Sequence, residues 1–142
     1  SNHHRKSLLL KRIDKIFKKN IKNKRIVFLG VTFKPNTDDM RDAASLYMIP
    51  HLHKKKAIIS YYDPTGEKKE FSKLKNCRFF SDIKSVCKIA DLIILHTEWD
   101  EFKSLDFKKL VKNKKFTLYD LRNLYSIDQM KKKKIRYFSI GR

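Results

Sequence analysis

Residues 30–41 read Gly-Val-Thr-Phe-Lys-Pro-Asn-Thr-Asp-Asp-Met-Arg, and this stretch decides the fold. It follows a short apolar run at residues 26–29, Ile-Val-Phe-Leu, which is typical of a buried strand. It precedes residues 43–48, Ala-Ala-Ser-Leu-Tyr-Met, which predict the start of a helix. The stretch is therefore a strand-to-helix loop. In an open parallel sheet such loops lie at the carboxyl ends of the strands, where ligands bind.

The charges of this loop favour an anionic partner. Thr37, Asp38 and Asp39 are candidates to cap the helix that follows, and an aspartate could also form a salt bridge with Arg41. Lys34 and Arg41 are less easily explained, because a cation near a helix N-terminus opposes the helix dipole by up to ~1 kcal/mol. A phosphate would offset that cost at a strand-to-helix loop.

The glycine content of the loop excludes one kind of phosphate site. Gly30 is the only glycine here, so the glycine-rich fingerprint of dinucleotide-binding folds is absent. Pro35 stiffens the turn and biases Lys34 toward an extended conformation. Spacing alone therefore predicts an anion-binding loop that does not hold a pyrophosphate as a Rossmann dinucleotide site does.

The rest of the chain alternates strand and helix patterns. Apolar and β-branched runs predict strands at residues 25–30, 57–62, 78–81, 91–97, 116–121 and 136–140. Helices are expected at residues 3–20, 42–55 (with a kink or break at Pro50), 67–74, 82–90, 100–112 and 126–134. Short links between alternating elements indicate an α/β, Rossmann-like open parallel sheet of five to six strands flanked by helices, with an N-terminal helix.

Three predicted loops bring chemistry to one edge of this sheet. They carry Lys34 with Arg41, Trp99, and Arg122. Cations and an aromatic ring suit a nucleotide sugar, although Trp99 could equally pack against the sheet edge. Asp63 ends the second strand, where a Rossmann acid would bind a ribose, but the Asp-Pro-Thr-Gly sequence is turn chemistry and we prefer a turn residue.

The composition indicates a folded domain with a strong positive charge. Lys and Arg number 35 against 15 Asp and Glu, giving a formal charge of +20, and 41% of the residues are hydrophobic. A nucleic-acid-binding module is the alternative from another class. The lysines are spread over every predicted element, however, and no nucleic-acid motif is present, so we favour solvated lysine faces. No apolar run is long enough to span a membrane.

Cysteine and histidine spacing predicts neither a zinc site nor disulfides. Cys77 and Cys87 lie in no CxxC pattern, and the five histidines lack metal-ligand spacing. Two thiols in a lysine-rich chain without a signal peptide are expected to be reduced, which places the protein in the cytoplasm. The chain begins at Ser1, in the middle of a helical pattern, and we expect it to be a fragment of a longer protein.

Three motifs resemble one enzyme family. Residues 30–45, GVTFKPNTDDMRDAAS, are similar to the signature loop in the C-terminal domain of nucleotide-sugar dehydrogenases, the UDP-glucose/GDP-mannose dehydrogenase family. Residues 96–102, HTEWDEF, resemble the family's T-E-W-x-x-F, and residues 120–125, DLRNLY, resemble D-G-R-N-x-Y. The motifs occur in the family's order. Thr37 and Met40 favour the branch that acts on UDP-glucose over those for UDP-N-acetylmannosamine or GDP-mannose.

The resemblance implies roles for four residues. Phe33 and Lys34 would contact the UDP-sugar, as would Arg122, and Arg41 would approach NAD bound to another domain. Leu121 departs from the family, which has glycine there. If that position requires a positive φ, leucine would strain the turn and displace Arg122.

The resemblance also implies what lies elsewhere. The family oxidises C6 of UDP-glucose to the acid of UDP-glucuronate with two NAD⁺, through a cysteine in a G-G-S-C-F-P-K-D motif that neither Cys77 nor Cys87 matches. Residues 1–22 would end the helix that connects the domains, and residues 23–142 would form the C-terminal UDP-sugar-binding domain. NAD-binding and central domains would lie outside the chain, which would carry no catalytic residue and be inactive alone. The full-length enzyme would be a homodimer.

Overall fold

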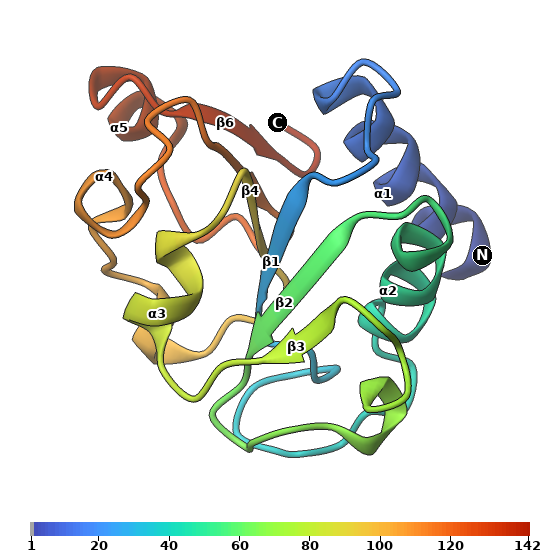
Figure 1. Cartoon of the computed structure of the whole chain (residues 1–142). Helices are drawn as coiled ribbons and strands as arrows, with labels where there is room; N and C mark the ends of the chain where they lie inside the picture. Colours follow the sequence, from blue (N-terminus) through green and yellow to red (C-terminus); the bar gives the residue numbers. More distant parts are fainter. Residues whose placement is uncertain (1) are drawn as a thin grey trace.

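The computed structural model describes residues 2–142, so Ser1, the first residue of the expected connecting segment, lies outside the described residues. Six parallel strands form one sheet in the order β3-β2-β1-β4-β5-β6 (Figure 1). The strands are β1 (Arg25–Leu29), β2 (Ile58–Tyr62), β3 (Cys77–Phe79), β4 (Leu92–Leu95), β5 (Thr117–Asp120) and β6 (Arg136–Ser139). The predicted α/β, Rossmann-like sheet is confirmed.

Helices cover both faces of the sheet. The α-helices are α1 (Asn2–Ile16), α2 (Ser45–Lys54), α3 (Ile83–Lys88), α4 (Phe107–Leu110) and α5 (Ile127–Lys132). Helices α1 and α2 lie on one side of the sheet, and α3, α4 and α5 lie on the other (Figure 1). Every residue of β4 is buried, as expected for a central parallel strand. Its apolar side chains point to both faces of the sheet, so both faces must be covered by helices.

The side chains of β1 divide between two cores. Ile26 and Phe28 belong to the cluster that packs under α1 and α2, whereas Val27 and Leu29 belong to the cluster under α3, α4 and α5. This division follows from the two-residue period of a strand. The apolar run at residues 26–29 is therefore buried on both sides.

Two expected helices are shorter than predicted. Residues 67–74 contain only the 3₁₀ turn η1 (Lys69–Phe71), and residues 100–112 contain the 3₁₀ turn η2 (Asp100–Phe102) and the one-turn helix α4. Pro50 neither breaks nor ends α2, which continues to Lys54. Fully buried Phe71 and Phe102 hold the two turns against the cores, where apolar packing takes the place of further helical hydrogen bonds.

The expected helix caps at residues 37–39 are wrong. Helix α2 begins only at Ser45, and its N-cap residue, Ala44, makes no side-chain cap. Thr37 and Asp39 instead accept hydrogen bonds from backbone amides within the loop. The first amide of the helix, that of Ser45, donates instead to the side chain of His96, which follows β4. A residue from another part of the fold therefore caps the start of α2.

The expected turn role of Asp63 is confirmed. Its carboxylate is buried at the end of β2 and accepts hydrogen bonds from the amide of Thr65 (2.9 Å) and from the amide of Val31 (2.9 Å). The second bond ties the turn to the start of the loop after β1. Both carboxylate oxygens are therefore engaged with the protein itself.

The strand order places a switch point between β1 and β4. The chain leaves β1 toward β2 on one side and leaves β4 toward β5 on the other, so the loops that follow the two strands diverge. In open parallel sheets such a divergence opens the crevice in which ligands bind. Gly30 ends β1 and His96 follows β4 at this point.

Candidate functional site

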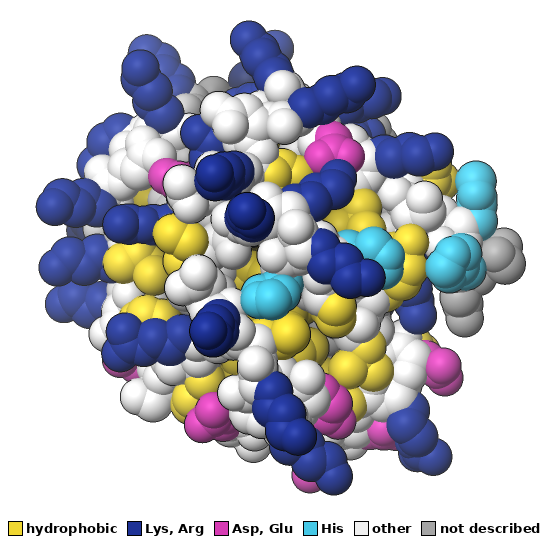
Figure 2. Space-filling model, turned by 45° about the vertical axis from the view of Figure 1, so that its right-hand side comes forward, with side chains coloured by type: hydrophobic (Ala, Val, Ile, Leu, Met, Phe, Trp, Pro, Cys, Tyr) yellow, Lys and Arg dark blue, Asp and Glu magenta, His cyan; other side chains and the backbone are white. Residues whose placement is uncertain are grey.

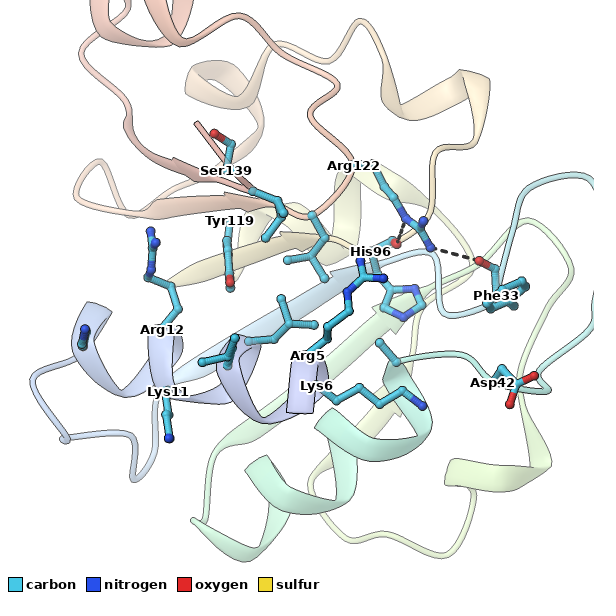
Figure 3. Close-up of a pocket in the computed structure, with 17 residues that line it drawn as sticks. Arg5, Lys6, Lys11, Arg12, Phe33, Asp42, His96, Tyr119, Arg122 and Ser139 are labelled. Carbon is cyan, nitrogen blue, oxygen red and sulfur yellow. Dashed lines mark hydrogen bonds between the residues drawn. The ribbon is translucent and has the colours of Figure 1, made fainter. Parts of the chain in front are cut away.

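A cleft of about 670 Å³ lies between α1 and the carboxyl edge of the sheet. Its floor includes the ends of β4, β5 and β6, and the loop after β1 closes one side (Figure 3). Among the described residues that line it, Asp42 is the one acid. The cationic residues that line it are Arg5, Lys6, Lys11, Arg12, Lys15 and Arg122. A concave site with this charge balance attracts anions.

Arg122 is held at the switch point by backbone carbonyls. Its Nε donates to the carbonyl oxygen of His96 (2.9 Å), and its Nη2 donates to that of Phe33 (3.0 Å). The side chain of Glu98 lies 3.7 Å from Nη1. Figure 3 shows the guanidinium reaching across His96 toward Phe33. About a third of the Arg122 side chain remains exposed, so the group is both oriented and open to a ligand.

The condition under which Leu121 would strain its turn is not met. Leu121 is not among the described residues with positive φ; Asn123 is, with φ 53°. Asn123 exchanges hydrogen bonds with the backbone of Ile140, and Asp120 accepts a bond from the amide of Arg122 (3.1 Å). These contacts fix the turn. The left-handed conformation falls on Asn123, and asparagine adopts it more readily than leucine does.

Phe33 and Lys34 take different positions in the loop. The Phe33 side chain lines the cleft and the residue is 47% exposed, which is unusual for an aromatic residue in a well-packed domain. Lys34 is exposed, does not line the cleft, and within residues 2–142 its ammonium makes no hydrogen bond or ion pair. The structure therefore brings Phe33 and Arg122 together and leaves Lys34 outside the cleft.

Arg41 is paired within its own loop. Its guanidinium binds the carboxylate of Asp39 through two nitrogens, at 3.0 Å from Nε and 2.8 Å from Nη2, so the salt bridge expected as an alternative to capping is confirmed. The hydrogen bonds from Arg41 lower the pKa of Asp39 to about 2. The Arg41 side chain is 88% exposed and does not line the cleft.

Trp99 packs into the protein instead of facing the cleft. The residue is half-buried against the core under α3, α4 and α5, and its indole nitrogen is buried without a hydrogen-bond partner in the described part of the chain. Of the two roles considered for Trp99, packing against the sheet edge is the one that the structure supports.

Two contributors to the cleft were not expected from the sequence. The first is the cationic face of α1, including Arg5 and Arg12. In the sequence this face is typical of a solvated helix, but in the structure it lines the cleft beside the sheet (Figure 3). The helical period of the lysines and arginines could have indicated a single face. The second is His96, which lies in the T-E-W motif region but has no spacing that would mark it.

His96 is a buried histidine with a defined tautomer. Its Nε2 accepts a hydrogen bond from the amide of Ser45 (2.9 Å), so Nε2 carries no proton. Nδ1 is therefore protonated in the neutral ring and donates to the hydroxyl of Thr97 (2.8 Å). Burial, together with the nearby charge of Arg122, lowers the pKa of His96 to about 3.

This burial predicts an acid-sensitive fold. As pH falls through 6.5, the unfolded chain takes up a proton on residue 96 while the folded protein does not until about pH 3. Stability should thus fall across that window by up to about 1.4 kcal/mol per pH unit. Urea unfolding of wild type and of a His96→Asn variant at several pH values checks this. The difference between their stabilities should shrink or reverse on acidification, and parallel pH profiles would contradict the prediction.

The thiols offer no nucleophile. Burial raises the pKa of Cys77 and of Cys87 to about 12, so neither is a thiolate near neutral pH. Among residues 2–142 no group of three metal-ligating side chains is placed to hold an ion. In the same part of the chain no helix is long and apolar enough to cross a bilayer.

The loop after β1 does not fit the pyrophosphate of NAD. Gly30 has φ +78°, and a Cβ atom there would lie 2.7 Å from the Cβ of Thr97. The space beside this glycine is therefore filled by the protein, and the loop has no second glycine through which its backbone could approach a pyrophosphate. No residue of the loop replaces a glycine-rich cradle.

Together, the fold and the cleft define a class of protein: a Rossmann-like domain with a cationic cleft at its switch point. Residues 27–127 match the model of the UDP-glucose/GDP-mannose dehydrogenase family, UDP binding domain, and the chain belongs to this family. The resemblance expected from the three motifs is confirmed.

Individual relatives agree with this assignment. The chain is 36% identical to a UDP-glucose 6-dehydrogenase of Rhizobium meliloti over 142 residues, covering 99% of this chain and 32% of the relative. It is 33% identical to that of Rickettsia bellii, covering 99% and 33%. The fold resembles the NDP-N-acetyl-D-galactosaminuronic acid dehydrogenase of Methanosarcina mazei Go1 (TM-score 0.79, 21% identity, 98% of this chain and 29% of that one). The chain spans about a third of the length of these curated relatives.

Proposed function

We propose that this chain is the C-terminal domain with which a UDP-glucose 6-dehydrogenase binds UDP-glucose. Residues 1–22 would end the helix connecting it to the rest of the enzyme, and residues 23–142 would form the UDP-sugar-binding domain. The observation that carries the proposal is the cleft at the switch point, whose lining holds six cationic residues and one acid. A nucleoside diphosphate carries the complementary charge.

Three residues would contact the substrate. The oriented guanidinium of Arg122 has its exposed edge toward the cleft and would bind a phosphate oxygen, in competition with Glu98 at 3.7 Å. The half-exposed ring of Phe33 would cover a base or sugar face. Lys34, whose ammonium makes no hydrogen bond or ion pair among the described residues, would turn its flexible side chain toward the diphosphate from outside the cleft.

The remaining chemistry would come from outside this chain. NAD would bind mainly to an N-terminal domain, with Arg41 approaching it once released from Asp39. Hydride transfer and the covalent step would also belong to parts of the protein that this chain does not include, so the isolated chain is expected to be inactive. A homodimeric, cytoplasmic enzyme that converts UDP-glucose to UDP-glucuronate completes the proposal.

Replacing Lys34 by alanine tests the proposed substrate contact. Because the variant removes one charge-assisted contact to phosphate, UDP should bind the chain roughly tenfold more weakly, a loss of about 1.4 kcal/mol. Isothermal titration with UDP at low salt measures the effect. Lys75→Ala is the matched control. Lys75 is also an exposed lysine, but it precedes β3 and so lies at the amino ends of the strands, away from the cleft.

Competing ligands separate the alternatives. Weaker binding of GDP than of UDP supports the UDP-glucose branch, whereas the reverse order would favour a GDP-mannose dehydrogenase. A nucleic-acid module would bind duplex DNA with a steep salt dependence and lose affinity equally in the Lys34 and Lys75 variants. Lysine and arginine side chains are spread widely over the face shown in Figure 2, with no single stripe of them, which favours the nucleotide-sugar proposal.

A further inference from the structure

We propose that His96 is a positioning residue for the UDP-sugar site: its neutral ring, protonated on Nδ1, holds the loop after β1 so that Phe33 stays bonded to Arg122 at the edge of the cleft. The inference rests on the proposed function for its ligand, but the arrangement that it describes can be tested without one. His96 contacts the cleft wall and acts through the groups around it.

The ring joins two segments that the chain keeps far apart. The amide of Ser45, at the start of α2, donates to Nε2, and the Ser45 hydroxyl donates to the carbonyl of Val31 (2.6 Å). His96 itself follows β4. One imidazole therefore links the end of β4 to the start of α2, and the loop between residues 31 and 44 is closed at both of its ends.

The second ring nitrogen continues this linkage toward the ligand. Nδ1–H donates to the Thr97 hydroxyl, which in turn donates to the carbonyl of Thr32 (2.7 Å). The next carbonyl, that of Phe33, accepts from Arg122, and Arg122 also donates to the carbonyl of His96. The bonds form a closed circuit through residues 96, 97, 32, 33 and 122. Such linked bonds in a buried setting support one another.

The directions of the two bonds made by the Thr97 hydroxyl depend on the tautomer of His96. If Nε2 carried the proton, it would face the amide of Ser45, donor against donor. The Thr97 hydroxyl would then donate to Nδ1 and could no longer donate to Thr32. An aliphatic residue at position 96 could fill the same volume but would leave the Ser45 amide without its acceptor.

The surroundings keep the ring neutral. Arg122, which donates to the carbonyl of His96, is the charged group next to the ring, and Arg5 and Lys6 of α1 line the same cleft (Figure 3). The His96 residue itself is 1% exposed. Both ring nitrogens already have partners in Ser45 and Thr97, and the carboxylate of Glu98, on the same loop, pairs with Arg122 at 3.7 Å. Among the described residues that line the cleft, Asp42 is the one acid.

Side-chain ¹⁵N NMR of the wild-type chain tests the tautomer directly. We expect a protonated Nδ1, an unprotonated Nε2, and signals that do not titrate between about pH 8 and pH 5. The Arg122 Nε–H should give a slowly exchanging signal. The opposite tautomer, or a ring that titrates like an exposed histidine, would overturn the proposal whether or not UDP binds.

Three variants test the effect on the site. His96→Asn keeps a donor at the Nδ1 position, His96→Gln keeps an acceptor near the Nε2 position, and His96→Leu keeps neither. We expect UDP affinity to fall about tenfold in the leucine variant and to be largely rescued in the asparagine variant, since only the Thr97 arm leads to the ligand side. The Arg122 Nε–H signal should shift in the leucine variant and stay close to its wild-type position in the asparagine variant.

A control separates positioning from stability. Val86→Ala removes buried methyl groups from α3, on the opposite side of the sheet, and should destabilise the fold without changing UDP affinity. Equal UDP affinity and an unchanged Arg122 signal in a folded leucine variant would overturn the inference. If UDP fails to bind the wild-type chain, the proposed function fails, and the NMR results alone then decide the role of His96.

Discussion

Replacing Gly30 by alanine should destabilise the protein by about 2–5 kcal/mol, through a positive φ and a steric clash acting together. Gly30 has φ +78°, and an added Cβ would lie 2.7 Å from the Cβ and 2.9 Å from the Oγ1 of Thr97, and 3.2 Å from the ring of Phe102. Neither neighbour can move easily, because Phe102 is fully buried and the Thr97 hydroxyl bonds to the carbonyl of Thr32. Urea unfolding of the purified chain measures the loss.

Gly66 provides the matched control. It also has a positive φ, +95°, but a Cβ added there would meet no atom within 4 Å. Gly66→Ala should therefore show only the backbone effect, about 1 kcal/mol. The comparison isolates the clash at the switch point, and similar losses in the two variants would rule it out.

Replacing Asp120 by alanine is the second large change, expected to lower the free energy of unfolding by about 3–5 kcal/mol. Its fully buried carboxylate accepts hydrogen bonds from the amides of Arg122 and Tyr125 and from the hydroxyl of Tyr137 (2.7 Å). Alanine would leave these donors without an acceptor. Because one of them is the Arg122 amide, UDP affinity should fall along with stability.

A graded series tests this explanation. Asp120→Asn keeps one oxygen but turns an NH₂ group toward a donor. Its loss of stability should therefore lie between those of Tyr137→Phe and Asp120→Ala. Tyr137→Phe removes one of the donors and not the acceptor, and should cost about 1 kcal/mol. Thermal unfolding of the variants should rank wild type, Tyr137→Phe, Asp120→Asn and Asp120→Ala in falling stability. An alanine variant as stable as the phenylalanine variant would show that the carboxylate is not the hub of this turn.

Gly30→Ala and Asp120→Ala concern the same feature, the place where β1, β4 and β5 meet at their carboxyl ends. Gly30 allows β1 and the Thr97 region to approach closely, and Asp120 fixes the turn that carries Arg122. The cleft depends on these two packing solutions as much as on the cations that line it. Substitutions at Gly30 or Asp120 should therefore affect ligand binding through geometry.

Local sequence was enough to predict a parallel α/β sheet of five to six strands, the turn at Asp63 and the family, because each depends on local periodicity, turn chemistry or a contiguous motif. The expectation that residues 37–39 cap the helix was wrong for a physical reason. Whether Asp39 caps a helix, and whether position 121 requires a positive φ, depends on partners that local sequence does not contain.

Only the tertiary structure decided how the site is assembled. Ser45 and His96, which bond directly, lie 51 positions apart, and Arg122 and Phe33 lie 89 positions apart. The cations of α1 line the cleft because a helix from the start of the chain packs against the sheet whose last strand ends the chain (Figure 1). A hydrogen bond or a charged wall between such distant residues exists only after folding has brought them together, so no window of the sequence could display it.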